Sequence, residues 1–359
     1  MNPHHRFIEP LDVLVLRANK LFGDAGTYGE ALVPPWPSVA AGALRSRMMA
    51  DDPALSAAQL QDPAFFTLSA FHLARRIGER VEPLHSIPAD VVIEGAGEVI
   101  KVMRPHALTP GLLSSAQLEQ VPILAEAERG KPEAGYWLTQ VGWSVYLAGQ
   151  QLLPEHLVAS KDLWSLESRV GVGLHATARR ADDGKLFTTQ AIAFRTGVGF
   201  LASARAERLP EQGLLRFGGD GRAATIAPCE SELPPALPQP CGRFKVVLTT
   251  PGLFPQGWLP PAIDEARLWR LPGATARLVC AAIPRAQVVS GWDLARREPK
   301  PAQRVAPTGS VYWFDDFQGD TDELRKLSEH GLWGFPGQND DPMRRAEGFN
   351  RCAIGGWID

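Results

Sequence analysis

The chain has 359 residues, of which 45% are hydrophobic and 21% are charged, and its formal net charge is -3 with a pI near 6.3. This composition excludes a disordered chain, and no apolar run approaches the roughly 20 residues needed to span a bilayer. The length suits two domains, while the mild negative charge argues against a general affinity for nucleic acid. The amino-terminal MNPHHRFIEP lacks the apolar core of a signal peptide, so we expect a cytoplasmic protein.

The first half of the chain predicts a strand, a helix, two strands and a second helix. After Leu11 the first strand is almost continuously apolar, as in a strand buried within a sheet. PPWPS then stops extended pairing, and Ser38 is a natural N-cap for a helix whose apolar stripe excludes Arg45 and Arg47. This order is the first part of a ferredoxin-like βαββαβ unit. The predicted elements are strands at 7–18, 65–76 and 80–95 and helices at 38–50 and 136–153.

The second half predicts strands first and then a helix, a glycine-rich loop and a last strand. A hairpin over residues 167–194 is expected to turn at ADDGK, residues 181–185. A helix near 321–330 is expected to end at Gly331. We therefore expect an α+β fold of two linked units, one at 1–160 and one at 161–359. The further predicted strands lie at 197–205, 243–250, 274–284, 309–314 and near the C-terminus.

The sequence carries no recognisable catalytic or metal-binding motif. GxSxG, Walker A and HExxH patterns are absent, and the four cysteines show no CxxC spacing. His72, His85 and His175 fall in predicted strands, where a structural histidine is the commoner interpretation. Solvated loop acids are likewise the commoner interpretation of Asp315–Asp316 and Asp340–Asp341. We expect no enzyme, no cofactor and no metal.

Three segments place arginines beside glycines and aromatic residues, a combination that suits RNA. Glycine amides can approach phosphate closely, and a base can stack on an indole while cations hold the backbone. Between Arg267 and Arg304 the chain carries eight basic residues against two acidic ones. The segments are RFGGDGRAA (216–224), SGWDLARREPKP (290–301) and MRRAEGFNRCAIGGW (343–357).

These strings, taken in order, resemble one known family over nearly the whole chain. They are FIEPLDVLVLRANKLFG, PPWPSVAAGALRS, IPADVV, ESRVGVGL with GKLFTT, LLRFGGDGRAA, KVVLTTPGLFPQGWLP, VSGWDLARREPKP, PTGSVYWF and GFNRCAIGGW. The sequence resembles the third subunit of the CRISPR type III-B (Cmr) effector, in the RAMP superfamily of RNA-recognition-motif-like proteins. The resemblance implies two ferredoxin-like domains with long loop insertions and a glycine-rich loop before the last strand.

The same resemblance implies a role in antiviral defence without catalysis. Members of the family grip the repeat-derived 5′ tag of the guide RNA. They also bridge the large polymerase/cyclase-like subunit to the helical backbone subunit. The implied partners are therefore this RNA and these two proteins, with no membrane and no cofactor.

Candidate RNA-binding residues come from the matched motifs and from the basic segments. The end loop reads GFNRCA where relatives read closer to GFGLA, so Asn350 and Arg351 replace small or apolar residues. RANKLFG also departs from the usual RDGRPF, which favours Arg17 over Lys20. The candidates are Arg17, Lys20, Arg45, Arg169, Gly171, Gly218, Gly219, Arg222, Trp292, Arg296, Arg297, Arg344, Arg345, Gly348, Phe349, Asn350 and Arg351.

Two alternatives remain open from the sequence. A RAMP-type endoribonuclease that cuts precursor RNA would need His4 and His5, or His175, as acid or base. A metabolic α+β enzyme would bind a small anion through the glycine loops. A hairpin that inserts between bases as a thumb could come from residues 80–105 or 167–190.

Overall fold

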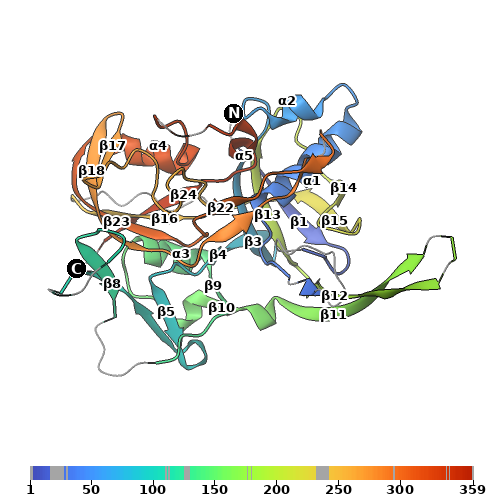
Figure 1. The fold of residues 1–359 in the computed structure, drawn as a ribbon, viewed down its shortest axis with the longest axis horizontal. Helices are drawn as coiled ribbons and strands as arrows, with labels where there is room; N and C mark the ends of the chain where they lie inside the picture. The colour runs from blue at the N-terminus through green and yellow to red at the C-terminus, as the bar shows by residue number, and fades with distance from the viewer. Residues whose placement is uncertain are drawn as a thin grey trace. The chain divides into compact units, whose positions relative to one another are not determined.

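The computed structural model describes residues 3–16, 28–29, 31–109, 111, 114–124, 130–175, 177–178, 180–231, 242–293, 296–336, 338 and 340–357. The chain forms two compact units that are interleaved along the sequence (Figure 1). The expected division at 160/161 therefore does not hold, because β1 pairs with strands more than 190 residues later. The first unit contains Met1–Pro83, Ser160–Ser231 and Ser290–Pro301, and the second contains Leu84–Ala159, Glu232–Val289 and Ala302–Asp359.

An antiparallel sheet is the centre of the first unit. β1 lies between β13 and β15, with β3 beyond β13 and β14 beyond β15. The strand predicted at 7–18 is shorter, because the chain bends at Leu11 and Asp12, and of the described residues 11–16 only Leu14 makes a further bridge, to Ile192. The strands are β1 (His4–Pro10), β3 (Thr67–Ile77), β13 (Val198–Arg205), β14 (Gly213–Arg216) and β15 (Ala223–Pro228).

Helix α1 (Pro37–Asp51) packs against β3 and β14. Pro37 occupies its first turn and Trp36 is the N-cap residue without a side-chain cap, so the prediction of Ser38 as N-cap is wrong. Proline has its φ angle fixed near the helical value, which lets the helix begin one residue early. The predicted apolar stripe is confirmed by the buried Ala40, Ala43, Leu44 and Met48. The short α2 (Ala57–Gln61) begins with a capping box from Ser56 and Gln59.

Four phenylalanine rings form the aromatic core of the first unit. The Phe200 ring centre lies 5.4 Å from that of Phe71, 5.1 Å from that of Phe217 and 5.4 Å from that of Phe194. Phe194 is the last residue of β12, and Phe217 follows β14 directly. These rings therefore fix the end of β12 and the start of the loop that follows β14.

That hairpin is formed by β11 (Trp164–His175) and β12 (Arg180–Phe194), and β2 (Tyr28–Gly29) pairs in parallel with β12. It extends away from the sheet of its own unit (Figure 1). The turn predicted at 181–185 is wrong, because these residues belong to β12. Val172 faces Leu186 and Leu174 faces Ala181. Over this stretch β12 therefore contains more residues than β11, and the polar run forms a bulge within β12.

A five-stranded antiparallel sheet with core on both faces organises the second unit, in the order β17-β18-β23-β16-β24. Val246 belongs to one hydrophobic cluster and Val247 to the other, which explains the continuous apolar run of β16. Phe314 stacks on Phe244 at 5.2 Å and on Trp269 at 4.7 Å. The strands are β16 (Phe244–Leu248), β17 (Leu268–Leu271), β18 (Ala274–Ala282), β23 (Val311–Gly319) and β24 (Cys352–Gly356).

Three helices belong to the second unit: α3 (Gln140–Leu147), α4 (Asp322–His330) and α5 (Pro342–Ala346). Both α3 and α4 contact β24. The helix predicted at 136–153 is shorter than expected, because Thr139 caps α3 by accepting a hydrogen bond from the Gly142 amide at 3.0 Å. The predicted end of α4 at Gly331 is confirmed by its φ of 77°.

Short elements complete the chain. β4 starts in the first unit and ends in the second, where it pairs with β9. Among the described helices, none has both the length and the apolar character needed to cross a membrane. The short strands are β4 (Arg80–Ser86), β5 (Val91–Glu94), β6 (Val99–Val102), β7 (Arg104–Ala107), β8 (Gln120–Ile123), β9 (Tyr136–Leu138), β10 (Leu157–Ala159), β19 (Gln287–Val289), β20 (Trp292–Asp293), β21 (Glu298–Pro299) and β22 (Gln303–Val305). The 3-10 turns are η1 (Gly95–Gly97), η2 (Pro154–His156) and η3 (Ser160–Asp162).

Candidate nucleic-acid interface

The glycine loop between β14 and β15 packs against the segment that follows β1. The Gly219 amide donates to the Val15 carbonyl at 2.8 Å. A Cβ on Gly218, whose φ is 81°, would lie 2.9 Å from the same carbonyl oxygen. Gly218 is therefore needed for a close approach between two parts of the chain itself, and the Gly219 amide bonds them together. Leu16 is the last described residue of this segment, and the candidates Arg17 and Lys20 lie outside the described residues.

Arg222 is the basic group of this loop, which also carries the exposed Asp220. Its Nη1 lies 2.9 Å from Asp12 Oδ2, and 28% of its side chain is exposed. The Phe217 amide donates to the Arg222 carbonyl at 2.9 Å, which closes the loop above the aromatic core. Arg216, just before the loop, is exposed. The loop thus carries two arginines on a base that buried aromatic rings hold in place.

The base of the β11–β12 hairpin meets the same segment. Leu14 and Ile192 form a bridge, and their amides donate to each other's carbonyls at 2.9 and 2.8 Å. Phe194 at the end of β12 and Phe217 at the start of the glycine loop both contact Phe200. Sequence reasoning proposed the hairpin and the loop separately, and the structure brings their bases together.

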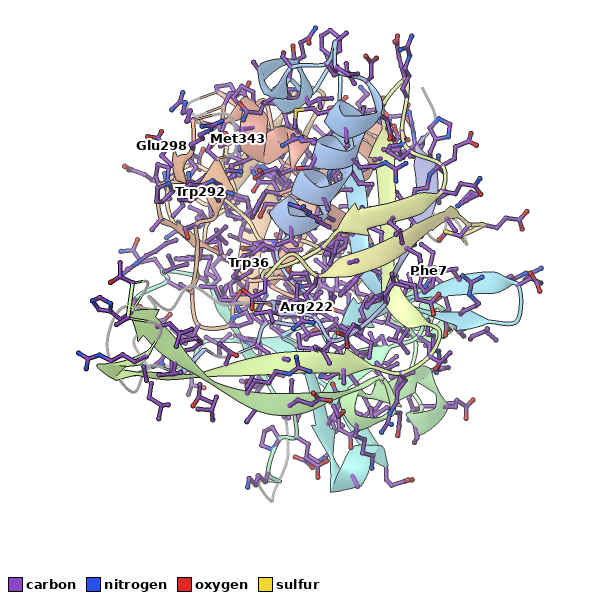
Figure 2. All side chains as sticks on the ribbon, turned by 90° about the vertical axis from the view of Figure 1, so that its right-hand side faces the viewer. Phe7, Trp36, Arg222, Trp292, Glu298 and Met343 are labelled. Atoms are coloured by element: carbon purple, nitrogen blue, oxygen red, sulfur yellow. The ribbon has the colours of Figure 1, made fainter. Side chains whose placement is uncertain are left out.

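The hairpin itself presents apolar side chains to solvent. Arg169 lies on β11 and forms an exposed ion pair with Glu167 at 3.2 Å. Gly171 faces Phe187 across the hairpin, and a Cβ at Gly171 would collide with that ring. Figure 2 shows side chains directed outward along the ribbon. The exposed apolar residues are Leu166 (51%), Val170 (67%), Val172 (42%), Leu174 (67%) and Leu186 (58%).

These apolar side chains were not among the predicted site residues. Apolar alternation in a strand predicts one buried face, and the sequence gives no sign that this face lacks a partner within the chain. Of the two candidate thumbs, residues 91–102 form the β5–β6 hairpin, in which Val91, Val92 and Ile93 are buried. The exposed β11–β12 hairpin is therefore the better candidate.

A second surface hairpin carries the predicted tryptophan. Trp292 in β20 pairs with Pro299 in β21, and its side chain is 55% exposed (Figure 2). Arg296 and Arg297 lie at the turn, and Arg296 Nη1 is 3.7 Å from Glu298 Oε1. The structure thus brings these three predicted residues together in a single hairpin of the first unit.

Arg45 has a different position from the one expected. Its side chain is 7% exposed, and its guanidinium carbon lies 4.8 Å from the centre of the Phe66 ring. The expectation that Arg45 lies off the buried face of α1 is wrong. An arginine can be buried when its planar group stacks on an aromatic ring. We assign it to packing of the helix.

The candidates near the C-terminus are also mostly internal. Arg344 is 1% exposed, with Nη1 donating to Glu347 Oε2 at 3.1 Å. Arg351 is 4% exposed and donates from Nη1 to the Glu329 carbonyl at 2.9 Å. Arg345 is half-buried. Gly348, Phe349 and Asn350 are buried as well, so most side chains of this segment form core, and Arg345 is the candidate in it that reaches the surface.

Asn350, which departs from the pattern expected from the resemblance, has a clear structural role. Its φ is 60°, a region that asparagine tolerates better than most residues. Its Oδ1 accepts from the Leu253 amide at 2.6 Å, and its Nδ2 donates to the Leu332 carbonyl at 3.1 Å. The departure from the family pattern therefore adds internal hydrogen bonds to the loop.

The histidines proposed for the cleavage alternative are not assembled by any described contact. His5 Nδ1 lies 2.7 Å from Ser203 Oγ, and burial lowers the pKa of this imidazole. His175 Nδ1 lies 3.1 Å from Thr177 Oγ1 at the far end of the hairpin. Within the described part of the chain, His5 and His175 form no hydrogen bond or ion pair with each other, while the charge of the neighbouring His4 also lowers the pKa of His5.

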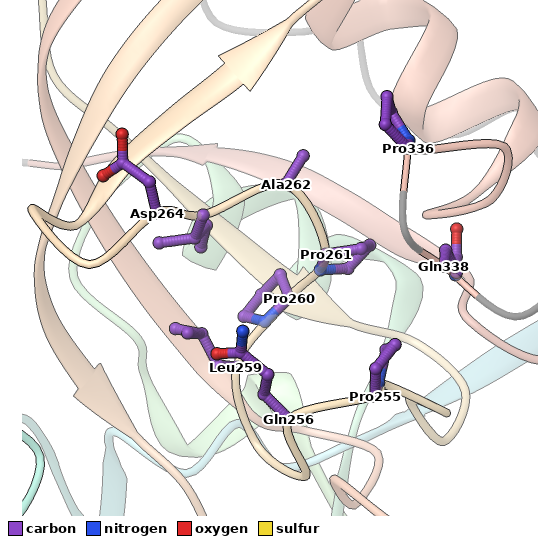
Figure 3. Close-up of a pocket in the computed structure, with 10 residues that line it drawn as sticks. Pro255, Gln256, Leu259, Pro260, Pro261, Ala262, Asp264, Pro336 and Gln338 are labelled. Carbon is purple, nitrogen blue, oxygen red and sulfur yellow. The ribbon is translucent and has the colours of Figure 1, made fainter.

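Acidic groups also show no metal-binding arrangement in the described ranges. Burial and the charge of Asp316 raise the pKa of Asp315, and Arg277 lies 3.7 Å from Asp316. A pocket of about 290 Å³ in the second unit has four prolines among its ten lining residues (Figure 3). Its carboxylate, Asp264, is held by the Leu268 amide and Arg270, both at 3.0 Å, which lowers the pKa of Asp264.

Comparison with known proteins gives a family and a fold. The model of a family described as CRISPR-associated protein (Cas_Cmr3) matches residues 6–357. One chain in a structure of the type III-B Cmr-beta complex bound to cognate target RNA is 12% identical, with a TM-score of 0.54. That match covers 97% of this chain and 96% of the other. A chain from the complex with target RNA and AMPPnP, in state 1, is 14% identical, with a TM-score of 0.53 and 86% of each chain covered. No curated protein matches the chain.

Proposed function

The chain belongs to the Cas_Cmr3 family of CRISPR-associated proteins, and from that premise we propose that it grips the 5′ tag of a guide RNA through its first unit. In this proposal it is a non-catalytic subunit of a type III-B complex in antiviral defence. The observation that carries the proposal is the shared aromatic base of the β11–β12 hairpin and the Phe217–Arg222 loop. These aromatic rings fix the position of the exposed β11–β12 hairpin relative to the loop that carries Arg222.

The chemistry of these two features suits single-stranded RNA. Arg216 and Arg222 can hold phosphates, which fixes the register of the strand without reading its sequence. Apolar side chains such as Val170 and Leu174 can contact unstacked bases, since single-stranded RNA presents its base faces openly. Trp292, with Arg296 and Arg297, offers a second place where stacking and charge coincide.

The ion pair between Arg222 and Asp12 favours recognition in a defined geometry. The carboxylate orients the guanidinium without burying it, and 65% of the Asp12 side chain is exposed. Exposed pairs of this kind contribute only about 0–1 kcal/mol to stability, so a phosphate can replace the carboxylate at little cost. The arginine is thus held in position before RNA arrives.

The remaining parts of the proposal follow from family membership. The subunit would bridge the large polymerase/cyclase-like subunit and the helical backbone subunit, and each of its two α+β units would be a ferredoxin-like domain. We propose that turnover of RNA belongs to other subunits, in keeping with a sequence that carries no GxSxG, Walker A or HExxH motif.

Binding of labelled guide RNA, with its tag intact or scrambled, tests this function. It would be measured at several salt concentrations with and without the large subunit. Preference for the intact tag without cleavage over hours is the expected result. Equal binding of both RNAs would refute tag recognition, and metal-independent cutting would favour the endoribonuclease.

Two arginine variants sharpen the experiment. Arg222→Ala should weaken binding of all RNAs and reduce the slope of log K against log salt by about 0.7 per lost phosphate contact. Arg208→Ala is the matched control, because Arg208 also forms an exposed pair in the first unit, with Asp52 at 2.9 Å. Equal effects of the two variants would remove the special role of the loop.

A further inference from the structure

A cavity of about 250 Å³ in the second unit contains a buried cluster of a carboxylate, an amine and a phenol. It lies at the edge of the core cluster beneath α3. Its lining includes Asp90, Tyr146, Lys245, Trp313, Trp357 and Arg104. All of these residues are in the second unit, so the cavity is separate from the proposed RNA-binding features of the first unit.

Asp90 is the centre of this cluster and is only partly satisfied. It is 0% exposed, and its Oδ1 accepts a hydrogen bond from the Tyr146 hydroxyl at 2.7 Å. Among the described residues no group hydrogen-bonds to its Oδ2, which lies 3.7 Å from Lys245 Nζ. That separation is longer than a direct hydrogen bond, so Oδ2 keeps a free hydrogen-bonding position, which a ligand reaches by displacing the side chains that bury it.

Lys245 is the second polar group and is equally enclosed. It is 4% exposed, and its Nζ lies 3.5 Å from the centre of the Tyr146 ring. Burial raises the pKa of Asp90 and lowers the pKa of Lys245, while the two charges oppose these shifts. Buried charges are normally paired and fully hydrogen-bonded, and the open carboxylate oxygen departs from that rule.

The fold makes room for Lys245 through a glycine. Lys245 in β16 faces Gly355 in β24, and a Cβ at that glycine would lie 3.1 Å from Lys245 Cε and 3.2 Å from Leu147 Cδ2. Glycine weakens a strand interior, because it has no side chain to pack. Its presence here allows the lysine stem to lie across the neighbouring strand. The polar cluster of Asp90, Tyr146 and Lys245 therefore lies where hydrophobic core would be expected.

The arrangement offers an acceptor beside a donor, between aromatic rings. Asp90 Oδ2 can accept from a ligand N–H, and Lys245 Nζ can donate to an adjacent ligand oxygen or ring nitrogen. Trp313 and Trp357 line the same cavity, and Arg104 is exposed near it. An adjacent donor and acceptor on a flat aromatic edge is the pattern of a nucleobase. The volume is below the roughly 300–1,000 Å³ of pockets for drug-sized ligands, so it suits one base.

We propose that this cavity binds one nucleobase, hydrogen-bonded to Asp90 and Lys245, with the attached phosphate directed toward Arg104. The base can come from a free nucleotide or from a nucleotide within an RNA strand. The proposal is independent of tag recognition by the first unit, because it uses none of the same residues.

Calorimetric titration of the full-length chain tests it, with GMP, AMP, CMP, UMP and a four-nucleotide RNA as separate ligands. Binding of at least one mononucleotide identifies a free-nucleotide site, and binding of the RNA alone identifies a strand-bound base. In either case Asp90→Asn should weaken binding at least tenfold. Asp264→Asn is the matched control, since it alters a carboxylate at a different pocket of the same unit.

Two further variants keep the test decisive where Asp90→Asn alone disturbs folding. Asp90→Asn/Lys245→Met removes both buried charges, and the half-buried Trp357→Leu alters one wall. Each should lose binding while its far-ultraviolet circular dichroism stays that of the unchanged chain. Failure of all five ligands to bind, or wild-type affinity in the double variant, would overturn the proposal. Tag binding measured through Arg222→Ala is unaffected by either outcome.

Discussion

Replacing Arg344 by methionine tests whether the glycine-rich C-terminal segment is core. The guanidinium donates to Glu347 Oε2 and to Gln303 Oε1, both at 3.1 Å, and stands 5.2 Å from the Phe349 ring centre. Methionine keeps much of the volume but leaves the carboxylate of Glu347, which is 1% exposed, without its counter-charge. Breaking a buried ion pair in this way costs about 3–5 kcal/mol.

The charge argument has its own control in the double variant Arg344→Met/Glu347→Leu. Removing both charges together is often neutral or stabilising, so most of the lost stability should return. Urea unfolding followed by circular dichroism measures both variants. With a denaturant slope of about 1–3 kcal/mol/M, a loss of about 3 kcal/mol lowers the midpoint by about 1 M or more.

Either of two results would refute the reasoning. A single variant that loses less than about 1 kcal/mol but binds RNA with a smaller salt slope would place Arg344 on the RNA-binding surface. A double variant as unstable as the single one would show that shape, and not charge pairing, determines the loss.

Three further predictions concern backbone geometry and pH. Gly218→Ala should lower the free energy of unfolding by about 1–3 kcal/mol in urea, because alanine is strained at the positive φ of this position and its Cβ would clash with Val15. Gly221→Ala should cost about 1 kcal/mol, since this position has a φ of 65° but nothing that a Cβ would clash with. Burial lowers the pKa of His72 to about 4 from its ordinary 6.5. The folded state then binds fewer protons, so stability should fall by up to about 3 kcal/mol as the pH drops from 6.5 to 4. A stability–pH curve that His72→Gln leaves unchanged would contradict this. Asn350→Ala should be less stable than Asn350→Gly by about 1 kcal/mol, since both lose the side-chain bonds but only alanine is strained at positive φ; equal midpoints would count against that strain.

Regular patterns in the sequence predicted the longer helices and most of the longer strands, but few of the short strands. Continuous apolar runs located β16, β18 and β23, and a helical turn followed by Gly331 located α4. The hairpin of β11 and β12 was also predicted, but its turn was misplaced. Polar ADDGK has the composition of a turn, and only the pairing of Leu174 with Ala181 shows that it lies within a strand.

The candidate site was less predictable, because burial of a charged residue depends on partners far along the chain. Arg351 is buried through the carbonyl of Glu329, and Arg45 through the ring of Phe66. Local sequence suggests that such residues lie at the surface. Trp292, Arg169 and Arg222 do lie at least partly exposed, as an RNA-binding role requires, and that role stays a prediction.

The interleaving of the two units has a consequence for synthesis on the ribosome. β1 emerges about 190 to 220 residues before its partners β13 and β15. The second unit waits longer still, since β24 ends at Gly356 and pairs along β16. Neither unit can therefore finish folding during most of translation, and its unpaired strand edges stay open to aggregation. Shortening the chain from its C-terminus should yield insoluble product, so half-length fragments are poor material for assigning RNA contacts.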